Sequence, residues 1–393
     1  MIERRISPKI LSYARQYPVV TITGPRQSGK TTLCKKLFPR LPYFSLESMD
    51  VRSYARDDPL GFLGECVKKG AIIDEIQRVP ELTSYIQPIV DEKDKEGLFI
   101  LTGSQNFQVM NTISQSLAGR TALATLMTFS LQEIYKNKMP SWEEVLYRGF
   151  YPRIHDKKLN PTQALSFYVS TYLERDIREL INVKDISKFE VFLKLCAAHT
   201  GQILNFSNLA NDCGVTHNTA RSWLSVLEAS YIIFLLPPYY QNFRKRLIKS
   251  PKLYFTDSGL AAYLLGIKNP AHIFNHPLKG ALFETFIVME ILKGRFNAGE
   301  TSNLYYFRDN IGNEVDLILG YGRETIPIEI KLGKTISSDS LRGLRYYNKL
   351  NPKNGKKGYL IYGGNEDQSR SDVEIVAYKN ISHLIDGTWD VVR

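Results

Sequence analysis

Cysteines are few in this 393-residue chain, and they lie far apart. Cys34, Cys66, Cys196 and Cys213 form no CxxC pair, so the sequence predicts neither a zinc site nor a disulfide framework. Hydrophobic residues make up 43% of the chain and charged residues 23%. This balance is that of an ordinary folded protein and argues against extensive disorder.

Long hydrophobic runs are also absent. The longest apolar segment, residues 231–240, is short and contains Pro237 and Pro238, whereas a membrane-spanning helix needs about 20 apolar residues. The charged N-terminal segment has no apolar stretch behind it, which differs from the pattern of a secretory signal. We therefore expect a soluble, cytoplasmic protein that does not span a membrane.

Basic residues outnumber acidic ones. The chain has 51 Lys and Arg against 40 Asp and Glu, a formal net charge of +11. The excess is concentrated in residues 1–40, with nine basic and one acidic side chain, and in residues 201–252, with six and two. Such clusters attract polyanions such as DNA, but a solvated surface has the same composition.

Hydrophobic periodicity divides the chain into three parts. We predict that these are three domains, which span residues 1–130, 131–268 and 269–393. The first part alternates helices with short apolar strands, which is typical of an α/β fold with a parallel sheet. Long helical stretches dominate the second part, from Pro161 to about Leu236. The third part has a mixed α+β pattern, with a helix and four strands predicted near 282–292, 304–308, 314–319, 326–331 and 358–362.

A glycine-rich loop between the first strand (19–23) and the first helix (30–38) fits the pattern G-x-x-x-x-G-K-[ST]. This context is the one that a phosphate-binding P-loop requires. Backbone N–H groups of the loop can converge on phosphate oxygens, the lysine can reach the β- and γ-phosphates of ATP, and the following threonine can bind Mg²⁺. The predicted nucleotide-binding residues here are Gly24, Pro25, Arg26, Gln27, Ser28, Gly29, Lys30, Thr31 and Thr32.

Two carboxylates close the apolar strand at residues 71–74. Asp74 is expected to hold the Mg²⁺ ion with Thr31, and Glu75 to orient the attacking water. A base beside the metal indicates hydrolysis rather than binding alone. The next strand, 98–101, precedes Ser104 and Gln105, which are candidates for contacting the γ-phosphate or the water, although Ser104 could equally cap a turn.

Three arginines are candidates for a catalytic contact with the nucleotide. Arg120 stands alone in a stretch without other charges, and it could meet the γ-phosphate or pair with a structural carboxylate. Arg175 and Arg178 lie in a predicted helix, where they could act on a neighbouring subunit's nucleotide in a homo-oligomer or pair with nearby glutamates on the same helix.

Residues 206–227 have the rhythm of a helix-turn-helix, with Gly214 at the turn. The strand-like segment 231–236 and the basic segment 244–252 could form the wing of a winged helix. In DNA-binding proteins the second helix enters the major groove, and here it offers Thr216, His217, Asn218, Thr219 and Arg221. Winged helices also serve as lids or protein contacts, and the sequence leaves this alternative open.

The third part of the chain carries a set of acidic and basic residues on neighbouring elements. Glu284 lies in the predicted helix, Asp316 on one strand, and Glu329 and Lys331 on one face of the next strand. Asp316 and Glu329 could bind Mg²⁺ for phosphodiester cleavage, with Lys331 activating water. The alternative is an ion-pair cluster in a domain that has lost catalysis.

Together these motifs resemble the prokaryotic AAA+ ATPases fused to a C-terminal nuclease-like domain. The segments that carry the resemblance are 24–33, 71–82, 99–105, 116–120, 171–177, 255–266, 279–284, 314–316 and 326–331. It implies nucleotide and Mg²⁺ roles for Lys30, Thr31, Asp74 and Glu75. It also implies that Glu284, Asp316, Glu329 and Lys331 correspond to the PD-(D/E)XK nuclease set, although the site opens with Glu-Val-Asp instead of Pro-Asp.

The sequence therefore predicts a P-loop NTPase sheet, a helical and winged-helix domain, and an α+β nuclease-like domain. The expected activity is Mg²⁺-dependent ATP hydrolysis, coupled to DNA binding or cleavage. The alternative is a nucleotide-dependent switch whose later domains only dock a partner. A small-molecule kinase is disfavoured, because Glu75 beside Asp74 favours water as the acceptor.

Overall fold

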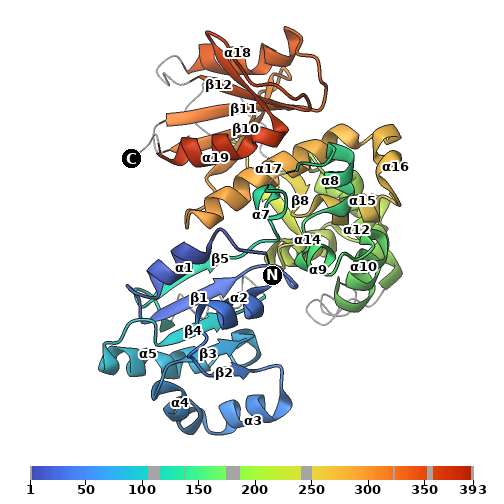
Figure 1. Cartoon of the computed structure of the whole chain (residues 1–393). Helices are drawn as coiled ribbons and strands as arrows, with labels where there is room; N and C mark the ends of the chain where they lie inside the picture. Colours follow the sequence, from blue (N-terminus) through green and yellow to red (C-terminus); the bar gives the residue numbers. More distant parts are fainter. Residues whose placement is uncertain are drawn as a thin grey trace.

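The computed structural model describes residues 2–104, 116–136, 138–173, 186–239, 250–321, 324–351 and 357–390. Its α/β part, helical part and C-terminal mixed sheet follow one another from the bottom to the top of Figure 1. Gln105, Arg175, Arg178 and most of the predicted basic wing (residues 244–249) lie outside the described residues.

The N-terminal part contains a five-stranded parallel sheet with the strand order β2-β3-β4-β1-β5. The strands are β1 (Val19–Thr23), β2 (Tyr43–Ser45), β3 (Ala71–Asp74), β4 (Phe99–Thr102) and β5 (Thr121–Thr125). The helices and the short helix η1 are α1 (Ser7–Tyr13), α2 (Lys30–Leu37), α3 (Met49–Asp57), α4 (Pro59–Val67), η1 (Ile76–Arg78) and α5 (Leu82–Lys93). The predicted α/β class is confirmed.

Both faces of this sheet are covered, because successive side chains of a strand point to opposite faces. Val20 and Ile22 of β1 pack in one hydrophobic cluster with residues of α1 and α2. Val19 packs in the other cluster, with residues of α4 and α5. All five residues of β1 are buried, which explains why its sequence is an unbroken β-branched run.

The middle part is largely helical. Its helices are α7 (Leu131–Ile134), α8 (Trp142–Arg148), α9 (Pro152–Asp156), α10 (Pro161–Tyr168), η2 (Val169–Leu173), α12 (Ile186–Ala198), α13 (Phe206–Asp212), α14 (His217–Ala229), α15 (Ser258–Leu264) and α16 (Pro270–Asn275). A small antiparallel sheet joins β6 (Gln202–Ile203), β8 (Lys252–Phe255) and β7 (Ile233–Leu236). The helical stretch predicted to continue to about Leu236 ends instead at Ala229, because Tyr231 adopts a left-handed turn (φ 57°) before the β-branched residues of β7.

The C-terminal part is a six-stranded mixed sheet with the order β13-β14-β12-β11-β10-β9. Its strands are β9 (Leu304–Arg308), β10 (Glu314–Tyr321), β11 (Glu324–Lys331), β12 (Gly358–Tyr362), β13 (Gln368–Ser369) and β14 (Val373–Ala377). Its helices are α17 (Lys279–Asn297), η3 (Asp339–Leu341), α18 (Arg342–Leu350), η5 (Tyr378–Asn380) and α19 (Ile381–Asp390). Residues of α17 and α18 pack in different clusters on opposite faces of this sheet.

Helix α17 belongs to a core that the middle and C-terminal parts share. One hydrophobic cluster includes Leu146 of α8, Leu260 of α15, Phe286 of α17 and Ile328 of β11. In Figure 1, α17 lies between the helical part and the C-terminal sheet. The three-domain division stays a prediction, and its second boundary falls within a continuous core.

Candidate nucleotide site and carboxylate cluster

The P-loop connects the carboxyl end of β1 to the start of α2. Gly24 and Gly29 have φ values of 141° and 91°, in the region that glycine adopts without steric cost. A side chain at Gly24 would also collide with the backbone carbonyl of Leu126. The glycines of the motif are therefore required by the local backbone.

Lys30 is only 5% exposed. Its ammonium donates hydrogen bonds to the carbonyl oxygens of Gly24 (2.9 Å) and Pro25 (2.8 Å). Burial lowers the pKa of Lys30 to about 8. The Ser28 hydroxyl is also buried, and no hydrogen-bond partner for it lies among the described residues. Both groups fit a phosphate ligand, which would bring negative charge and acceptor oxygens.

The structure brings Thr31 and Asp74 together, although 42 residues separate them in the sequence. The Thr31 hydroxyl donates to Oδ2 of Asp74 at 2.9 Å. Tyr43 donates to the same oxygen at 2.7 Å, and Thr102 donates to Oδ1. Sequence reasoning missed both partners. Thr102 could have been predicted as a partner of Asp74, because it ends β4, the strand beside β3. Nothing in the sequence distinguished Tyr43.

Glu75 adopts a left-handed backbone conformation (φ 60°). Its Oε2 atom accepts a hydrogen bond from the Ser104 hydroxyl at 3.1 Å and another from Nε2 of Gln77. Ser104 therefore contacts the predicted catalytic carboxylate. Gln77 was not predicted as a site residue, since it lies in the turn after the motif. Together, Ser104 and Gln77 fix the direction of the Glu75 carboxylate.

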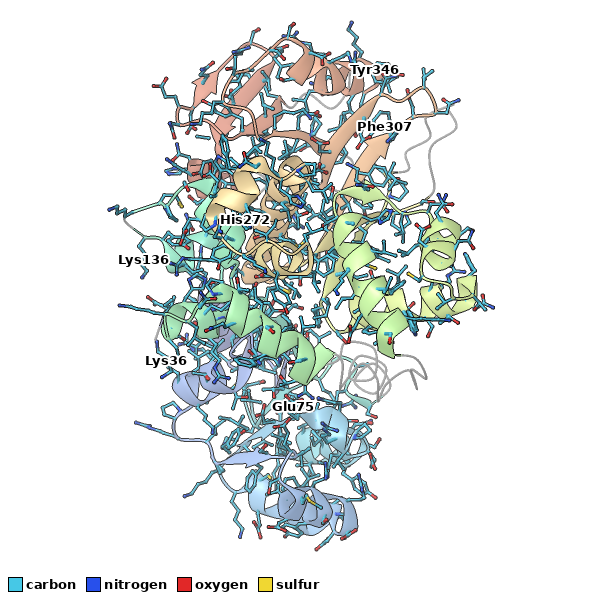
Figure 2. The ribbon with its side chains drawn as sticks, turned by 90° about the vertical axis from the view of Figure 1, so that its right-hand side faces the viewer. Lys36, Glu75, Lys136, His272, Phe307 and Tyr346 are labelled. Carbon is cyan, nitrogen blue, oxygen red and sulfur yellow. The ribbon has the colours of Figure 1, made fainter. Side chains whose placement is uncertain are left out.

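A cavity of about 700 Å³ lies between the P-loop and helix α9, a volume within the usual range for small-molecule sites. The P-loop residues 26–32 and Glu75 line one side. Pro152, Arg153 and Lys157 line the other side, together with the N-terminal Ile2 and Arg4 and with Phe129. Figure 2 labels Lys36, a further lining residue, and Glu75 at the level where the N-terminal part meets the middle helices.

The structure corrects the catalytic role predicted for Arg120. Its backbone carbonyl accepts a hydrogen bond from Val19, the first residue of β1, at 3.2 Å. The P-loop follows the last residue of β1, so Arg120 lies at the opposite edge of the sheet. Its guanidinium pairs with Asp91 at 2.5 and 2.7 Å. The sequence left two alternatives for Arg120, contact with the γ-phosphate or a pair with a structural carboxylate, and the structure shows the pair.

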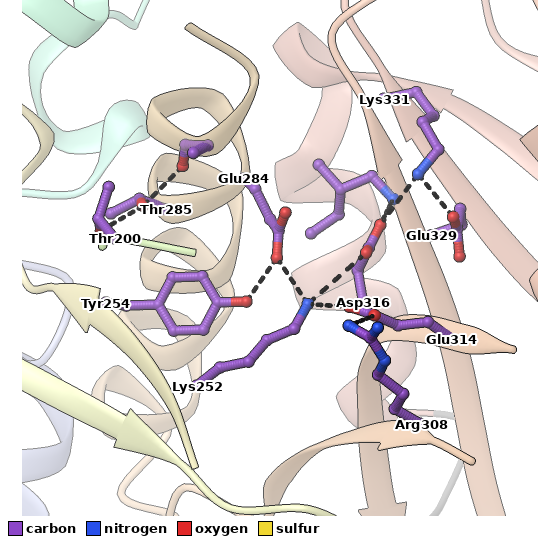
Figure 3. A network of polar contacts seen from close by, with 12 residues as sticks. Thr200, Lys252, Tyr254, Glu284, Thr285, Arg308, Glu314, Asp316, Glu329 and Lys331 are labelled. Carbon is purple, nitrogen blue, oxygen red and sulfur yellow. Dashed lines mark hydrogen bonds and ion pairs between the residues drawn. The ribbon is translucent and has the colours of Figure 1, made fainter. Parts of the chain in front are cut away.

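The second set of predicted residues also comes together, around a lysine that was not predicted (Figure 3). Lys252 extends from β8 of the middle part and is only 2% exposed. Its ammonium lies 3.1 Å from Glu284 Oε1, 2.5 Å from Glu314 Oε1 and 3.8 Å from Asp316 Oδ1. Tyr254 donates to Glu284 at 2.5 Å. We call these residues, with Arg308, Glu329 and Lys331, the carboxylate cluster.

Lys331 connects the two predicted metal ligands. Its ammonium lies 2.6 Å from Glu329 Oε1 and 3.4 Å from Asp316 Oδ2. Asp316 Oδ2 also accepts a hydrogen bond from the backbone N–H of Ile330 at 2.8 Å. Arg308 pairs with Glu314 at 3.0 Å. Burial and the charge of Asp316 raise the pKa of Glu329 to about 8.

The ammonium groups of Lys252 and Lys331 thus lie 2.6–3.8 Å from carboxylate oxygens of Asp316 and Glu329. In the part of the chain that the structure describes, no group of three or more His, Cys, Asp or Glu side chains is arranged to hold a metal ion. The structure therefore shows an ion-pair cluster at this place. The metal ligation expected of Asp316 and Glu329 and the catalytic roles expected of Glu284 and Lys331 stay predictions.

Helices α13 and α14 form the predicted helix-turn-helix. Thr216 is the N-cap of α14 and accepts a hydrogen bond from the backbone N–H of Thr219 at 3.1 Å. His217, Asn218 and Arg221 are exposed. Thr216 is exposed as well, so four of the five candidate DNA-contacting residues face solvent, and two of the five take part in the cap.

The structure also bears on the predicted absence of a membrane span. Among the described residues, no helix is both long and apolar enough to cross a bilayer.

Three family models match consecutive parts of the chain. Residues 16–135 match a model described as an AAA domain. Residues 139–271 and 279–381 match two domains of unknown function, DUF8612 and DUF4143. The first match includes the P-loop, Asp74 and Glu75, and it identifies the N-terminal part as an AAA-type ATPase domain.

The chain also has relatives along most of its length. The uncharacterised protein Rv2008c of Mycobacterium tuberculosis is 31% identical over 351 residues, which cover 87% of this chain and 77% of the relative. Mb2031c of Mycobacterium bovis matches to the same extent. Among solved structures, the Walker-type ATPase PABY2304 of Pyrococcus abyssi is similar with a TM-score of 0.44 and 13% identity, covering 67% of this chain and 96% of that chain. The chain belongs to the family of these mycobacterial proteins, and its residues 16–135 are an AAA domain.

Proposed function

We propose that this protein binds ATP with Mg²⁺ in the cavity between the P-loop and α9 and hydrolyses it. The observation that carries the proposal is the buried ammonium of Lys30, which is bonded to the Gly24 and Pro25 carbonyls. Beside it lies the Ser28 hydroxyl, for which the described part of the chain offers no hydrogen-bond partner. A triphosphate would supply the missing counter-charge and accept both groups' hydrogen bonds. Gly24–Thr32 would surround the phosphates, with Gly29 at the positive end of α2.

Thr31 and Asp74 would hold the Mg²⁺ ion, which neutralises charge on the phosphate oxygens when bound. The 2.9 Å hydrogen bond between them supports this assignment, because both oxygens already converge on one point. Glu75 would accept a proton from the attacking water. Ser104 and Gln77 would keep the Glu75 carboxylate oriented for this task.

The far wall of the cavity suggests how the rest of the nucleotide is held. Ile2, Phe129 and Pro152 offer apolar surface for the base, and Arg153 and Lys157 offer positive charge to the phosphates. Since Arg153 lies in α9 and Lys157 directly follows it, bound nucleotide would bridge the AAA domain and the middle part. Nucleotide exchange would then alter the contact between these two parts.

We propose that this change in contact is the output, and that the protein is a nucleotide-dependent switch. The carboxylate cluster favours this function over cleavage, because Lys252 and Lys331 pair with Asp316 and Glu329, the residues expected to bind metal. We further propose that α13, α14 and the β6-β8-β7 sheet form a winged helix. Its exposed His217, Asn218 and Arg221 would contact the partner, with DNA the first candidate given the basic charge.

Hydrolysis is tested by phosphate release from ATP in the presence of Mg²⁺. The full-length protein is expected to turn over ATP, and Lys30→Ala is expected to abolish it. Arg40→Ala, which removes an exposed basic residue outside the cavity, is the matched control and should retain activity. Equal activity in the wild type and in Lys30→Ala would refute the proposed site.

Cleavage is the second candidate function, favoured by the convergence of Glu284, Asp316, Glu329 and Lys331 on one point (Figure 3). Plasmid nicking with Mg²⁺ or Mn²⁺ separates the two functions. The switch proposal expects no nicking at any salt concentration. Nicking that is lost in Asp316→Ala but retained in Lys30→Ala would replace it with a nuclease.

A further inference from the structure

We propose that Arg4 positions the P-loop for nucleotide binding and links it mechanically to helix α17, an inference that rests on the proposed ATP site. Arg4 precedes α1 and is only 7% exposed. Its Nη1 atom donates to the carbonyl oxygen of Ser28 at 2.7 Å, and its Nη2 atom donates to that of Met127 at 2.7 Å. One planar guanidinium thus holds the P-loop and a distant segment together.

The contact with Ser28 bears directly on phosphate binding. In a trans peptide, the carbonyl of one residue and the N–H of the next point in opposite directions. Arg4 holds the Ser28 carbonyl away from the helix start, so the N–H of Gly29 is directed to the other side. Gly29 is the N-cap of α2 and lines the cavity. Arg4 therefore fixes a donor that the phosphates need, without touching the reacting atoms.

The other contacts of Arg4 reach the segment that connects the AAA domain to the middle part (residues 127–133, the connecting segment). Its Nε atom donates to Glu133 Oε1 at 3.1 Å, and its guanidinium lies 4.8 Å from the centre of the Phe129 ring. Glu133 Oε2 accepts the backbone N–H of Ser130 at 2.8 Å. The connecting segment is therefore held at one end by the residue that holds the P-loop.

The same segment is bonded to α17 on its other side. Lys293 donates to the carbonyl oxygen of Phe129 at 2.8 Å, and the N–H of Leu131 donates to Glu290 Oε2 at 2.7 Å. Lys293 and Glu290 pair with each other at 3.0 Å, with both side chains 2% exposed. Two buried ion pairs, Arg4–Glu133 and Glu290–Lys293, thus hold the four consecutive peptide units from Met127 to Leu131 between them.

Helix α17 continues to the carboxylate cluster, where it contributes Glu284. It is packed tightly over most of its length, and packed helices shift as rigid units. A movement of the Ser28 peptide on nucleotide binding would therefore be passed through Arg4 and the connecting segment to α17. This gives the proposed switch a physical route to the C-terminal sheet.

Calorimetry with ADP and Mg²⁺ tests the positioning role on the full-length protein. Arg4→Gln is expected to raise the Kd at least tenfold, the effect of losing a charge-assisted hydrogen bond. Arg4→Lys keeps the positive charge but loses the guanidinium that bonds two carbonyl oxygens at once. Its affinity for ADP should therefore lie between those of Arg4→Gln and the wild type. Wild-type affinity in Arg4→Gln would overturn the inference, whereas absence of binding by the wild type would instead overturn the proposed function.

Hydrogen exchange tests the link. In the wild type, ADP is expected to change exchange in residues 284–297 of α17. The double variant Glu290→Gln/Lys293→Met removes one buried pair without leaving an unpaired charge, so it should bind ADP as the wild type does. Its α17 exchange should no longer respond. An unchanged response in this variant would overturn the link, even if Arg4→Gln behaves as expected.

Discussion

Two buried lysines, one at the start of helix α2 and one at the start of strand β8, have opposite surroundings in this protein. Lys30 is 5% exposed and Lys252 is 2% exposed. Lys30 is bonded to backbone carbonyls beside a cavity of about 700 Å³, whereas Lys252 lies among Glu284, Glu314 and Asp316. Carbonyl dipoles stabilise an ammonium without cancelling its charge, and carboxylates cancel it. Lys30 therefore keeps a positive charge that an anionic ligand can bind, whereas Lys252 already has its counter-ions.

The pKa values of the two lysines shift in opposite directions because their neighbours differ in charge. Burial lowers the pKa of Lys30 to about 8. Burial also acts to lower the pKa of Lys252, but Glu284 and its neighbouring acidic groups raise it well above its ordinary value. Equal burial therefore does not make equal sites. The nearby charge distinguishes a binding site from a structural ion pair.

The largest expected effect is that of Lys252→Met on stability. It would leave the buried Asp316 and the half-buried Glu284 and Glu314 without their shared cation, which costs about 3–5 kcal/mol in unfolding free energy. Urea denaturation measures this loss. Lys252→Met/Glu284→Gln should recover part of it, and the exposed Lys268→Met should change little. A Lys252→Met variant as stable as the Lys268→Met control would show that the cluster is not a structural ion pair.

Glu75→Gln is expected to have the next largest effect, on the nucleotide site alone. Removal of the general base should slow phosphate release by about 100-fold or more. Binding of ATP, measured by calorimetry, should stay close to that of the wild type because Glu75 does not hold the phosphates. The exposed Glu81→Gln is the control for both assays. If Glu75→Gln hydrolysed ATP at the wild-type rate, water activation would have to be assigned elsewhere.

The lowered pKa of Lys30 predicts a pH effect on binding. Below about pH 8 the ammonium is charged in the free protein, and bound phosphates would raise its pKa further. Above pH 8, binding has to take up a proton, so ATP affinity should fall by up to about tenfold per pH unit. Calorimetry between pH 7 and 9.5 measures the slope. Lys30→Arg, whose guanidinium stays charged, should lack it, and a flat wild-type profile would contradict the argument.

The smallest effect is expected for Arg120→Ala. Its ion pair with Asp91 is on the surface, where such pairs contribute little, and it lies at the sheet edge opposite the P-loop. Thermal unfolding and phosphate release should both match the wild type. A strong loss of ATPase activity would instead mean that Arg120 reaches a nucleotide bound by another copy of the chain.

Prediction from the sequence succeeded where the structure depends on a short, continuous segment. The strand, loop and helix around Gly24–Thr31 are local, so their pattern indicated the phosphate site. Asp74 required one additional step, since parallel strands end at the same edge of a sheet. The contact between Ser104 and Glu75 was within reach for the same reason.

The sequence did not predict the partners that come from other parts of the chain. Lys252 lies 32 residues before Glu284 and in a different sheet from Asp316 and Glu329, and no pattern connected it to these carboxylates. The metal site predicted at Asp316 and Glu329 stays a prediction, because the type and spacing of residues did not reveal the ammonium group that Lys252 brings to Asp316. Arg4 is a similar case, since its guanidinium reaches carbonyl oxygens 24 and 123 residues away in the sequence.

The amino-acid sequence alone determined the α/β class, the P-loop and the residues that we propose to bind phosphate and magnesium, because local backbone geometry and strand polarity follow from nearby residues. Only the tertiary structure decided which charges are matched. Electrostatic balance depends on distance in space, and folding brings Lys252 and Arg4 to carboxylates and carbonyls that the chain order keeps apart.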